Sequence, residues 1–258
     1  MTNEEYVKAI ELRRSRRTYR TNALTPETMQ VIRALVDIVN EKAGLQFEFI
    51  EDGTFAFTLF TGKFSMIAVC GDDTEQTRIK AGYFGEMIVL ECAYHGLGTC
   101  WVNGSYNENK VLEMLKLPNE IRLYGVIVIG NVKPKLSQKE KLLYKITHKQ
   151  NKPYQKMFEI CDKKLPSYYE RAMQLVEKAP SATNNRPVHF KYEDGVISAY
   201  VDEPYSDKSI DFGIAQLHFA VGAESMGVKG EWDFSGRFCV EGSKLIKFPE
   251  NKEVNENE

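Results

Sequence analysis

A run of basic residues near the N-terminus has the composition of a phosphate-binding site. Four arginines and one hydroxyl follow one another as Arg13, Arg14, Ser15, Arg16 and Arg17. A guanidinium donates paired hydrogen bonds to phosphate oxygens, and the serine hydroxyl adds a neutral donor. Backbone N–H groups at a nearby helix N-terminus can add to such a site. The run therefore suits a phosphate dianion, although a solvated basic turn has the same composition.

A loop of small polar side chains lies in the second half of the chain. Residues 179–187 have the sequence APSATNNRP. Pro180 ends the helix before the loop, and hydroxyl and amide side chains follow it. Such a loop offers several hydrogen-bond donors to a polar heterocycle. The alternative is an ordinary polar turn before a strand.

A glycine-containing segment, residues 96–104 with the sequence GLGTCWVNG, is the third candidate. Small residues allow the backbone to approach a flat ligand closely. The alternative is a helix C-cap followed by a strand. The chain has no strand–GxGxxG–helix unit, so we exclude a Rossmann dinucleotide site.

Composition limits the partners of these candidates. The formal net charge of −2 gives no field that would recruit nucleic acid or an anionic membrane. The N-terminus has no apolar signal-peptide core, and no apolar run approaches the ~18–20 residues that span a bilayer. We therefore expect a cytoplasmic protein. The five cysteines form no CxxC pair, and His189 and His218 have no neighbouring ligand in the sequence, so we expect no metal site.

The elements that position these segments alternate between helical and strand periodicity. Helices are predicted over residues 3–12, 25–41, 75–95, 107–115, 166–178 and 207–226. Strands are predicted over residues 45–49, 54–61, 65–70, 123–129, 188–193 and 196–202, with a further strand from residue 228. The first two strands would form a hairpin at Asp52-Gly53. The helix over 75–95 is apolar nearly all round in its second half, which predicts that this half is buried.

The two halves of the chain resemble each other. Three residues, Gly82, Gly96 and Trp101, recur 131 positions later as Gly213, Gly227 and Trp232. Residues 46–53, QFEFIEDG, also resemble residues 188–195, VHFKYEDG, at an offset of 142. Two such helix–Gly–strand units can look alike by chance. A true repeat would give the fold a pseudo-twofold axis, with the two apolar helices packed across it.

Together the three segments resemble the FMN-dependent nitroreductase family. The sequence RRSRRTYRTNALTPETMQ resembles the family's RRSxRxF/Y…P opening, and APSATNNRPVHF resembles its APSxxNxQPWxF motif. The segment GLGTCWVNG resembles the family's segment after the central helix, which lies along the flavin ring. The resemblance implies an α+β nitroreductase-like fold with an antiparallel-rich sheet and flanking helices in each half. Family members are normally homodimers with FMN at the subunit interface.

The resemblance also implies the binding residues. The FMN phosphate would be held by Arg13, Arg14, Ser15 and Arg17. The far side of the flavin would meet Pro180, Ser181, Ala182 and Asn184. Backbone N–H groups toward flavin N5 and O4 would come from Asn103 and Gly104.

The chain departs from the family pattern at two further positions. Arg186 stands where the family often has glutamine. The family's later phosphate-binding pattern, K-x-R-x-P, appears here as residues 149–153, KQNKP. Lys149 fits this pattern, whereas Asn151 does not.

Each half keeps only one part of the family site. The first half has the arginine run, but residues 37–41 occupy the place of its polar loop within a helix. The second half has the polar loop and no arginine run before Pro166. This resembles the branch of the family in which one chain mimics the dimer. We therefore expect one FMN per chain, in a monomeric pseudo-dimer or a weak homodimer. The expected divisions are a first half at 1–132, a lysine-rich connector at 133–165, a second half at 166–250 and a disordered tail at 251–258.

The resemblance implies an FMN-dependent oxidoreductase that uses NADH or NADPH. Hydride would pass to flavin N5 and then to a small-molecule electron acceptor, such as a nitro compound or quinone, in a ping-pong sequence. The flavin carries this chemistry, so no side-chain acid or base is assigned. Two alternatives stay open: a flavin-binding sensor or carrier with little turnover, and a scaffold that has lost FMN and binds another phosphorylated partner.

Overall fold

The computed structural model describes residues 1–147, 153–162, 164–203, 207–233 and 236–241. Within these ranges it has seven α-helices and two sheets. The helices are α1 (Asn3–Leu12), α2 (Pro26–Ala43), α3 (Glu75–Tyr94), α4 (Glu108–Leu115), α5 (Gln138–Thr147), α6 (Ser167–Val176) and α7 (Asp207–Glu224). The strands are β1 (Glu48–Ile50), β2 (Ser65–Asp72), β3 (Gly98–Val102), β4 (Ile121–Gly130), β5 (Phe158–Ile160), β6 (His189–Glu193), β7 (Val196–Tyr200), β8 (Gly230–Trp232) and β9 (Arg237–Val240).

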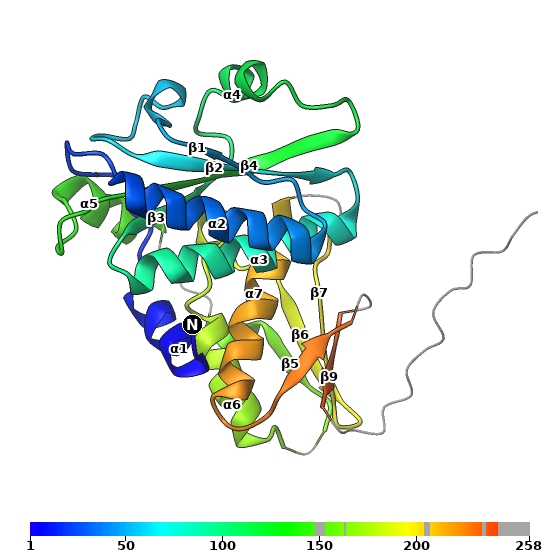
Figure 1. The fold of residues 1–258 in the computed structure, drawn as a ribbon. Coiled ribbons are helices and arrows are strands. Elements are labelled where there is room, and N and C mark those ends of the chain that lie inside the picture. Colours follow the sequence, from blue (N-terminus) through cyan, green and yellow to red (C-terminus); the bar gives the residue numbers. More distant parts are fainter. Residues whose placement is uncertain (148–152, 163, 204–206, 234–235, 242–258) are drawn as a thin grey trace, which may run out of the picture.

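The first sheet has the order β1-β2-β4-β3, and every pairing in it is antiparallel. Helices α2 and α3 lie on one face of this sheet, and α4 lies on the other (Figure 1). Because both faces are covered, nearly every residue of β2 and most residues of β4 are buried. Continuous apolar runs such as Met66–Cys70 are typical of strands buried on both faces.

The predicted hairpin over residues 45–61 is wrong. Strand β1 pairs with β2, so that Glu48 lies opposite Ala68. Residues Thr54–Ala56 form a 3-10 helix instead of a strand. The carboxylate of Asp52 accepts hydrogen bonds from the backbone N–H of Thr54 at 2.9 Å and from its hydroxyl. Such side-chain capping stabilises a turn in competition with a strand.

Of the residues behind that prediction, Phe57 belongs to an aromatic cluster, whereas Phe55 is exposed. The ring centroids of Phe57 and Phe60 lie 4.7 Å apart, and those of Tyr19 and Phe64 lie 5.2 Å apart. Only Phe57 of the alternating Phe55, Phe57 and Leu59 therefore packs against the core beside the first sheet. Leu59 is exposed, which an inward-facing strand position would not allow.

The second sheet has the order β5-β6-β7-β9-β8. Its strands are antiparallel except β5, which runs parallel to β6. Side chains of α6 and α7 form a core with this sheet; Tyr169, Phe219 and Phe238 are central to it. Strand β5 lies within the predicted connector at 133–165, and so does α5. The predicted tail at 251–258 lies outside the described residues.

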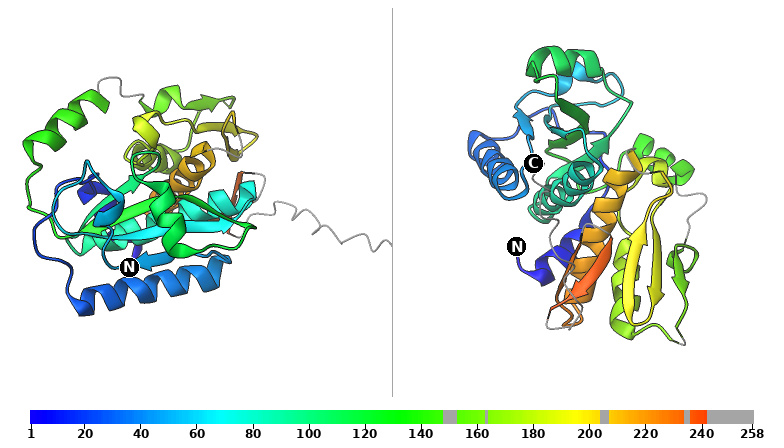
Figure 2. Two further views of the ribbon diagram at one scale, coloured as in Figure 1. Left: turned by 90° about the horizontal axis from the view of Figure 1, so that it is seen from above. Right: turned by 90° about the vertical axis from the view of Figure 1, so that its right-hand side faces the viewer.

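Helices α3 and α7 cross at the centre of the molecule, between the two sheets (Figure 1, Figure 2). A Cβ on Gly82 would lie 2.1 Å from the carbonyl oxygen of Ile210, and a Cβ on Gly213 would lie 1.9 Å from that of Ile79. Both glycines are required here because the two backbones touch. The contact is reciprocal at the offset of 131, as in an isologous interface.

The lengths and compositions of the helices bear on membrane insertion. None of the helices in the described part of the chain combines the length and apolar composition needed to cross a bilayer.

Candidate functional site

One cavity brings together the arginine run and the polar loop, which are about 165 residues apart in the sequence. Its volume is about 440 Å³, within the range of roughly 300–1,000 Å³ that is usual for small-molecule sites. We call it the arginine cavity. Its lining includes Arg13, Arg14, Ser15, Arg17, Glu140, Tyr144, Thr147, Lys178, Pro180, Ser181, Thr183, Asn184 and Arg186.

The arginine run is held in extended form beside β3. Ser15 forms a parallel bridge with Thr99, and the backbone N–H of Arg16 donates to the Thr99 carbonyl at 2.8 Å. Side chains of an extended segment alternate in direction. Arg16 is accordingly buried away from the cavity, where its Nε lies 3.2 Å from a Glu140 oxygen and its Nη1 donates to the Lys133 carbonyl. Arg16 therefore has a structural role.

Glu140 fixes the turn that follows the run. Its carboxylate accepts from the backbone N–H groups of Arg17, Thr18 and Ser137, at 2.7, 3.1 and 2.7 Å. Burial alone would raise the pKa of Glu140, but these backbone hydrogen bonds and the Arg16 side chain lower it to about 2. Carboxylates that accept several N–H groups are strongly favoured in the ionised form.

Glu140 should make the stability of the fold depend on pH. Its pKa is lower in the folded protein, so its contribution is present above the unfolded pKa near 4.5 and is lost as pH falls toward 2. A shift of this size corresponds to about 3 kcal/mol. We expect Glu140→Gln to lower the free energy of unfolding at pH 7 by about that amount, with the difference from wild type shrinking between pH 4.5 and 3.

Urea unfolding at a series of pH values measures this effect. The matched control is Glu113→Gln, which changes an exposed glutamate on α4. A wild-type-to-variant difference that stays constant from pH 7 to pH 3 would contradict the role assigned to Glu140.

Arg13 lies above a buried polar cluster that joins α3, α7 and β3. Glu86 is fully buried, and its carboxylate accepts from Trp101 Nε1 at 2.7 Å and lies 3.0 Å from His218 Nε2. The other ring nitrogen of His218 lies 3.0 Å from the Leu175 carbonyl. A carbonyl only accepts, so that nitrogen carries a proton.

The contact between His218 and Glu86 then needs one further proton, on either partner, so the pair is neutral as a whole. The cluster of Arg13, Glu86 and His218 therefore has a net charge of about +1, which the guanidinium of Arg13 carries; its Nε lies 3.7 Å from Glu86. It places a mostly buried positive charge beside the arginine cavity, which favours an anionic ligand.

Two arginine side chains of the cavity have donors to spare. Arg13 Nε is buried and has no hydrogen-bond partner in the part of the chain that the structure describes. Arg17 uses its backbone N–H for Glu140, while its guanidinium has no hydrogen bond or ion pair with any described residue. Arg13 Nη2 donates to the Lys178 carbonyl at 3.4 Å, and Arg14 Nη1 donates to the carbonyls of Glu11 and Arg13. Free guanidinium donors beside Ser15 fit a phosphate group.

The polar loop is tightly folded rather than an open turn. Residues Ala182–Asn184 form a 3-10 turn, and Thr183, Asn184 and Arg186 have positive φ angles of 51°, 59° and 50°. The Ser181 hydroxyl accepts from the backbone N–H of Arg186 at 2.9 Å. The N–H of Ala182 donates to the carboxylate of Asp211 on α7. That N–H is therefore engaged within the protein, and Ala182 itself does not line the cavity.

The remaining predicted residues lie elsewhere. Asn103 and Gly104 follow the end of β3 and are exposed, whereas Ser15 pairs near the start of that strand. Neither lines the arginine cavity. Lys149 lies outside the described residues. The structure thus joins the arginine run to Pro180, Ser181 and Asn184, and it does not add Asn103 and Gly104 to them.

Helix α5 supplies a cavity wall that sequence reasoning missed. Glu140, Tyr144 and Thr147 all line the cavity from this helix. Their spacing of four and then three residues is that of one helix face. This helical spacing was present in the lysine-rich segment. A search for apolar periodicity does not detect it, because the residues concerned are mostly polar.

The fold is α+β, and the arginine cavity is lined by more basic than acidic side chains. The family model described as "Putative TM nitroreductase" matches residues 5–223. Because this match spans most of the chain, the protein belongs to that nitroreductase family. Membership supports an oxidoreductase function in general.

One solved structure agrees with this chain in fold over nearly its whole length. A putative nitroreductase from Thermotoga maritima has a TM-score of 0.60 and 19% identity, over 93% of this chain and 94% of that chain. An FMN-dependent nitroreductase from Clostridium difficile has a TM-score of 0.41 and 19% identity, over 54% of this chain and 95% of that chain. No curated protein matches the chain.

Proposed function

We propose that the protein is an FMN-dependent oxidoreductase that uses NADH or NADPH and reduces a nitro compound, quinone or similar acceptor. The observation that carries this proposal is the meeting of the arginine run with residues 180–184 in one cavity. The two segments are the most specific parts of the family resemblance. The sequence led us to expect that the two segments bind the same FMN, and only a particular fold can bring them together.

The residues that line the arginine cavity fit FMN. Arg17 and Ser15 line the cavity with a guanidinium that has no partner among the described residues and a rotatable hydroxyl, and Arg13 adds a positive charge beside them, as a phosphate monoester requires. The loop at 180–184 offers a rigid polar surface at the other wall. FMN would supply the redox chemistry when bound, accepting hydride at N5 from the nicotinamide and passing it to the acceptor in a ping-pong sequence.

The chain's own residues bind and orient in this proposal. Glu140 orders the backbone of the segment that contains Ser15 and Arg17. Glu86, which is paired with His218, contacts the side chain of Arg13. Asp211 holds the polar loop through the N–H of Ala182. Such preorganised contacts reduce the entropy lost when a ligand binds.

One chain would hold one FMN. The arginine run lies in the first half and the polar loop in the second, so a single chain supplies both walls of the cavity. The reciprocal contact of Gly82 and Gly213 supports a pseudo-dimer built from one chain. Asn103 and Gly104 would contact the flavin ring only if it extends along β3 beyond the arginine cavity.

Reduction and reoxidation test this function. We expect the purified protein, loaded with FMN, to lose its flavin absorbance on mixing with NADH or NADPH in the absence of oxygen. A nitroarene or a quinone should then restore the absorbance. Flavin binding without this bleaching would indicate a sensor or carrier, and a failure to bind FMN would indicate a site for another phosphorylated ligand. Either result would overturn the proposed activity.

A further inference from the structure

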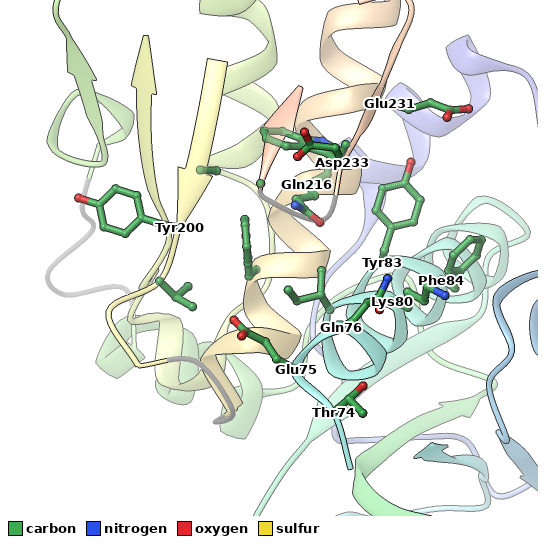
Figure 3. Close-up of a pocket in the computed structure, with 16 residues that line it drawn as sticks. Thr74, Glu75, Gln76, Lys80, Tyr83, Phe84, Tyr200, Gln216, Glu231 and Asp233 are labelled. Atoms are coloured by element: carbon green, nitrogen blue, oxygen red, sulfur yellow. The ribbon is translucent and has the colours of Figure 1, made fainter. Parts of the chain in front are cut away.

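A second, larger cavity lies between the halves and shares no lining residue with the arginine cavity. Its volume is about 770 Å³. Helix α3 forms one wall, and α7 with strands β7 and β8 forms the other (Figure 3). We call it the aromatic cavity, because Tyr83, Phe84, Phe212 and Trp232 line it.

The ring of Trp232 is fixed in place. Its Nε1 donates to the main-chain carbonyl of Gln216 at 2.9 Å, and its ring centroid lies 5.2 Å from that of Phe219 and 5.3 Å from that of Phe238. The ring is nevertheless half-buried and borders the cavity. A rigid indole surface is well suited to stacking with a planar ligand.

Gln216 is the unusual residue of this cavity. It is only 4% exposed, and its side-chain amide makes no hydrogen bond with any residue that the structure describes. Gln216 lies on α7 and lines the cavity together with Asp233, Gln76 and Tyr83 (Figure 3). The two amide atoms are not sealed from solvent, so the amide opens into the cavity, where water or a ligand completes its hydrogen bonds.

The charge of the aromatic cavity differs from that of the arginine cavity. Its lining has three carboxylates, Glu75, Glu231 and Asp233, against the single cation Lys80. At Tyr83, burial raises the pKa to about 12, with smaller contributions from the charges of Glu231 and Glu224. Among the described residues no arginine lines this cavity, so the described lining does not suit a phosphate ester.

We propose that the aromatic cavity binds a planar aromatic cation with an amide-like hydrogen-bonding edge. The ring would stack on Trp232 and Tyr83 by cation–π attraction. Its polar edge would pair with the Gln216 amide, and the carboxylates would complement its charge. This site is separate from the arginine cavity and does not depend on FMN binding there.

Three small probes of the same shape and different charge test the site. They are the 1-methylnicotinamide cation, neutral nicotinamide and the nicotinate anion. We expect 1H–15N NMR titration of the FMN-loaded protein to give saturable shifts in that order of affinity. The chain has two tryptophans, so the indole signal of Trp232 should move while that of Trp101 stays in place. Shifts at Trp101 alone, or equal affinity for the anion, would overturn the proposal.

Substitution of Gln216 separates ligand binding from structure. We expect Gln216→Leu to weaken binding of the cation about tenfold and to leave the melting temperature nearly unchanged, since the amide makes no hydrogen bond with a described residue. The matched control, Gln174→Leu at an exposed position on α6, should leave binding unchanged. If Gln216→Leu lowers the melting temperature and binding persists, the amide is structural and the proposed site is wrong.

Discussion

Replacement of Arg13 and Arg17 by alanine should abolish FMN retention. Both guanidiniums border the arginine cavity, and both have donors without partners among the described residues. Each charge-assisted hydrogen bond to a phosphate contributes about 1.5–3 kcal/mol. We therefore expect the double variant to raise the Kd for FMN about 1,000-fold, measured by quenching of flavin fluorescence during titration.

Two further variants make this result interpretable. Arg13 also faces Glu86, so its loss leaves a buried carboxylate with one partner fewer. Arg17→Ala alone avoids that problem and should still weaken binding about tenfold or more. The charge-matched control is Arg33→Ala with Arg122→Ala, which removes two exposed arginines that pair with Glu51 and Asp73. Unchanged FMN affinity in a folded Arg13→Ala/Arg17→Ala protein would show that the phosphate site is elsewhere.

Gly213→Ala should destabilise the whole protein even though alanine is the better helix former. The new Cβ would lie 1.9 Å from the carbonyl oxygen of Ile79 and 2.7 Å from the backbone nitrogen of Tyr83. These are backbone atoms of α3, so the clash is relieved only by moving the two central helices apart. Overpacking of this kind costs about 3 kcal/mol or more, which exceeds the gain of about 1 kcal/mol in helix propensity. Urea unfolding measures the difference.

The reciprocal contact at Gly82 predicts a similar loss of stability. Gly82→Ala should have a similar effect, because its Cβ would meet Ile210 in the same way. The double variant should cost less than the sum of the two, since the first separation of the helices also relieves the second clash. Gly195→Ala is the control: that glycine has a φ of 78° and open space around it, so only about 1 kcal/mol of backbone strain is expected. Equal costs for Gly213→Ala and Gly195→Ala would contradict close contact between α3 and α7.

The sequence predicted those elements whose ends carry local signals. Helix α2 begins at Pro26 with Thr25 as its N-cap, and it ends at Gly44 in the left-handed conformation, because capping depends on a few adjacent residues. The central helices were equally clear, since α3 and α7 are apolar on most faces. The hairpin prediction at 45–61 failed because Asp52 caps a turn at Thr54, and because the alternation at 55–59 includes the exposed Phe55 and Leu59.

The two segments of the candidate site were predictable from the sequence, but their meeting in one cavity was not. The arginine run and the polar loop consist of unusual residue types, so each was visible as a short segment. Their meeting depends on the crossing of α3 and α7, which local patterns do not encode. Contacts such as Glu86 with His218, and Asp211 with Ala182, join residues far apart in the chain. No spacing rule relates such pairs.

The amount of FMN bound per chain tests the central claim most directly. The protein should be incubated with excess FMN, freed of unbound flavin, and analysed by native mass spectrometry together with chromatography of the released cofactor. The account predicts one FMN for each chain, in a species that contains a single chain or a pair of chains with two FMN. Two FMN per single chain, one FMN shared by two chains, or no retained FMN would contradict a site formed within one chain by the arginine run and the polar loop.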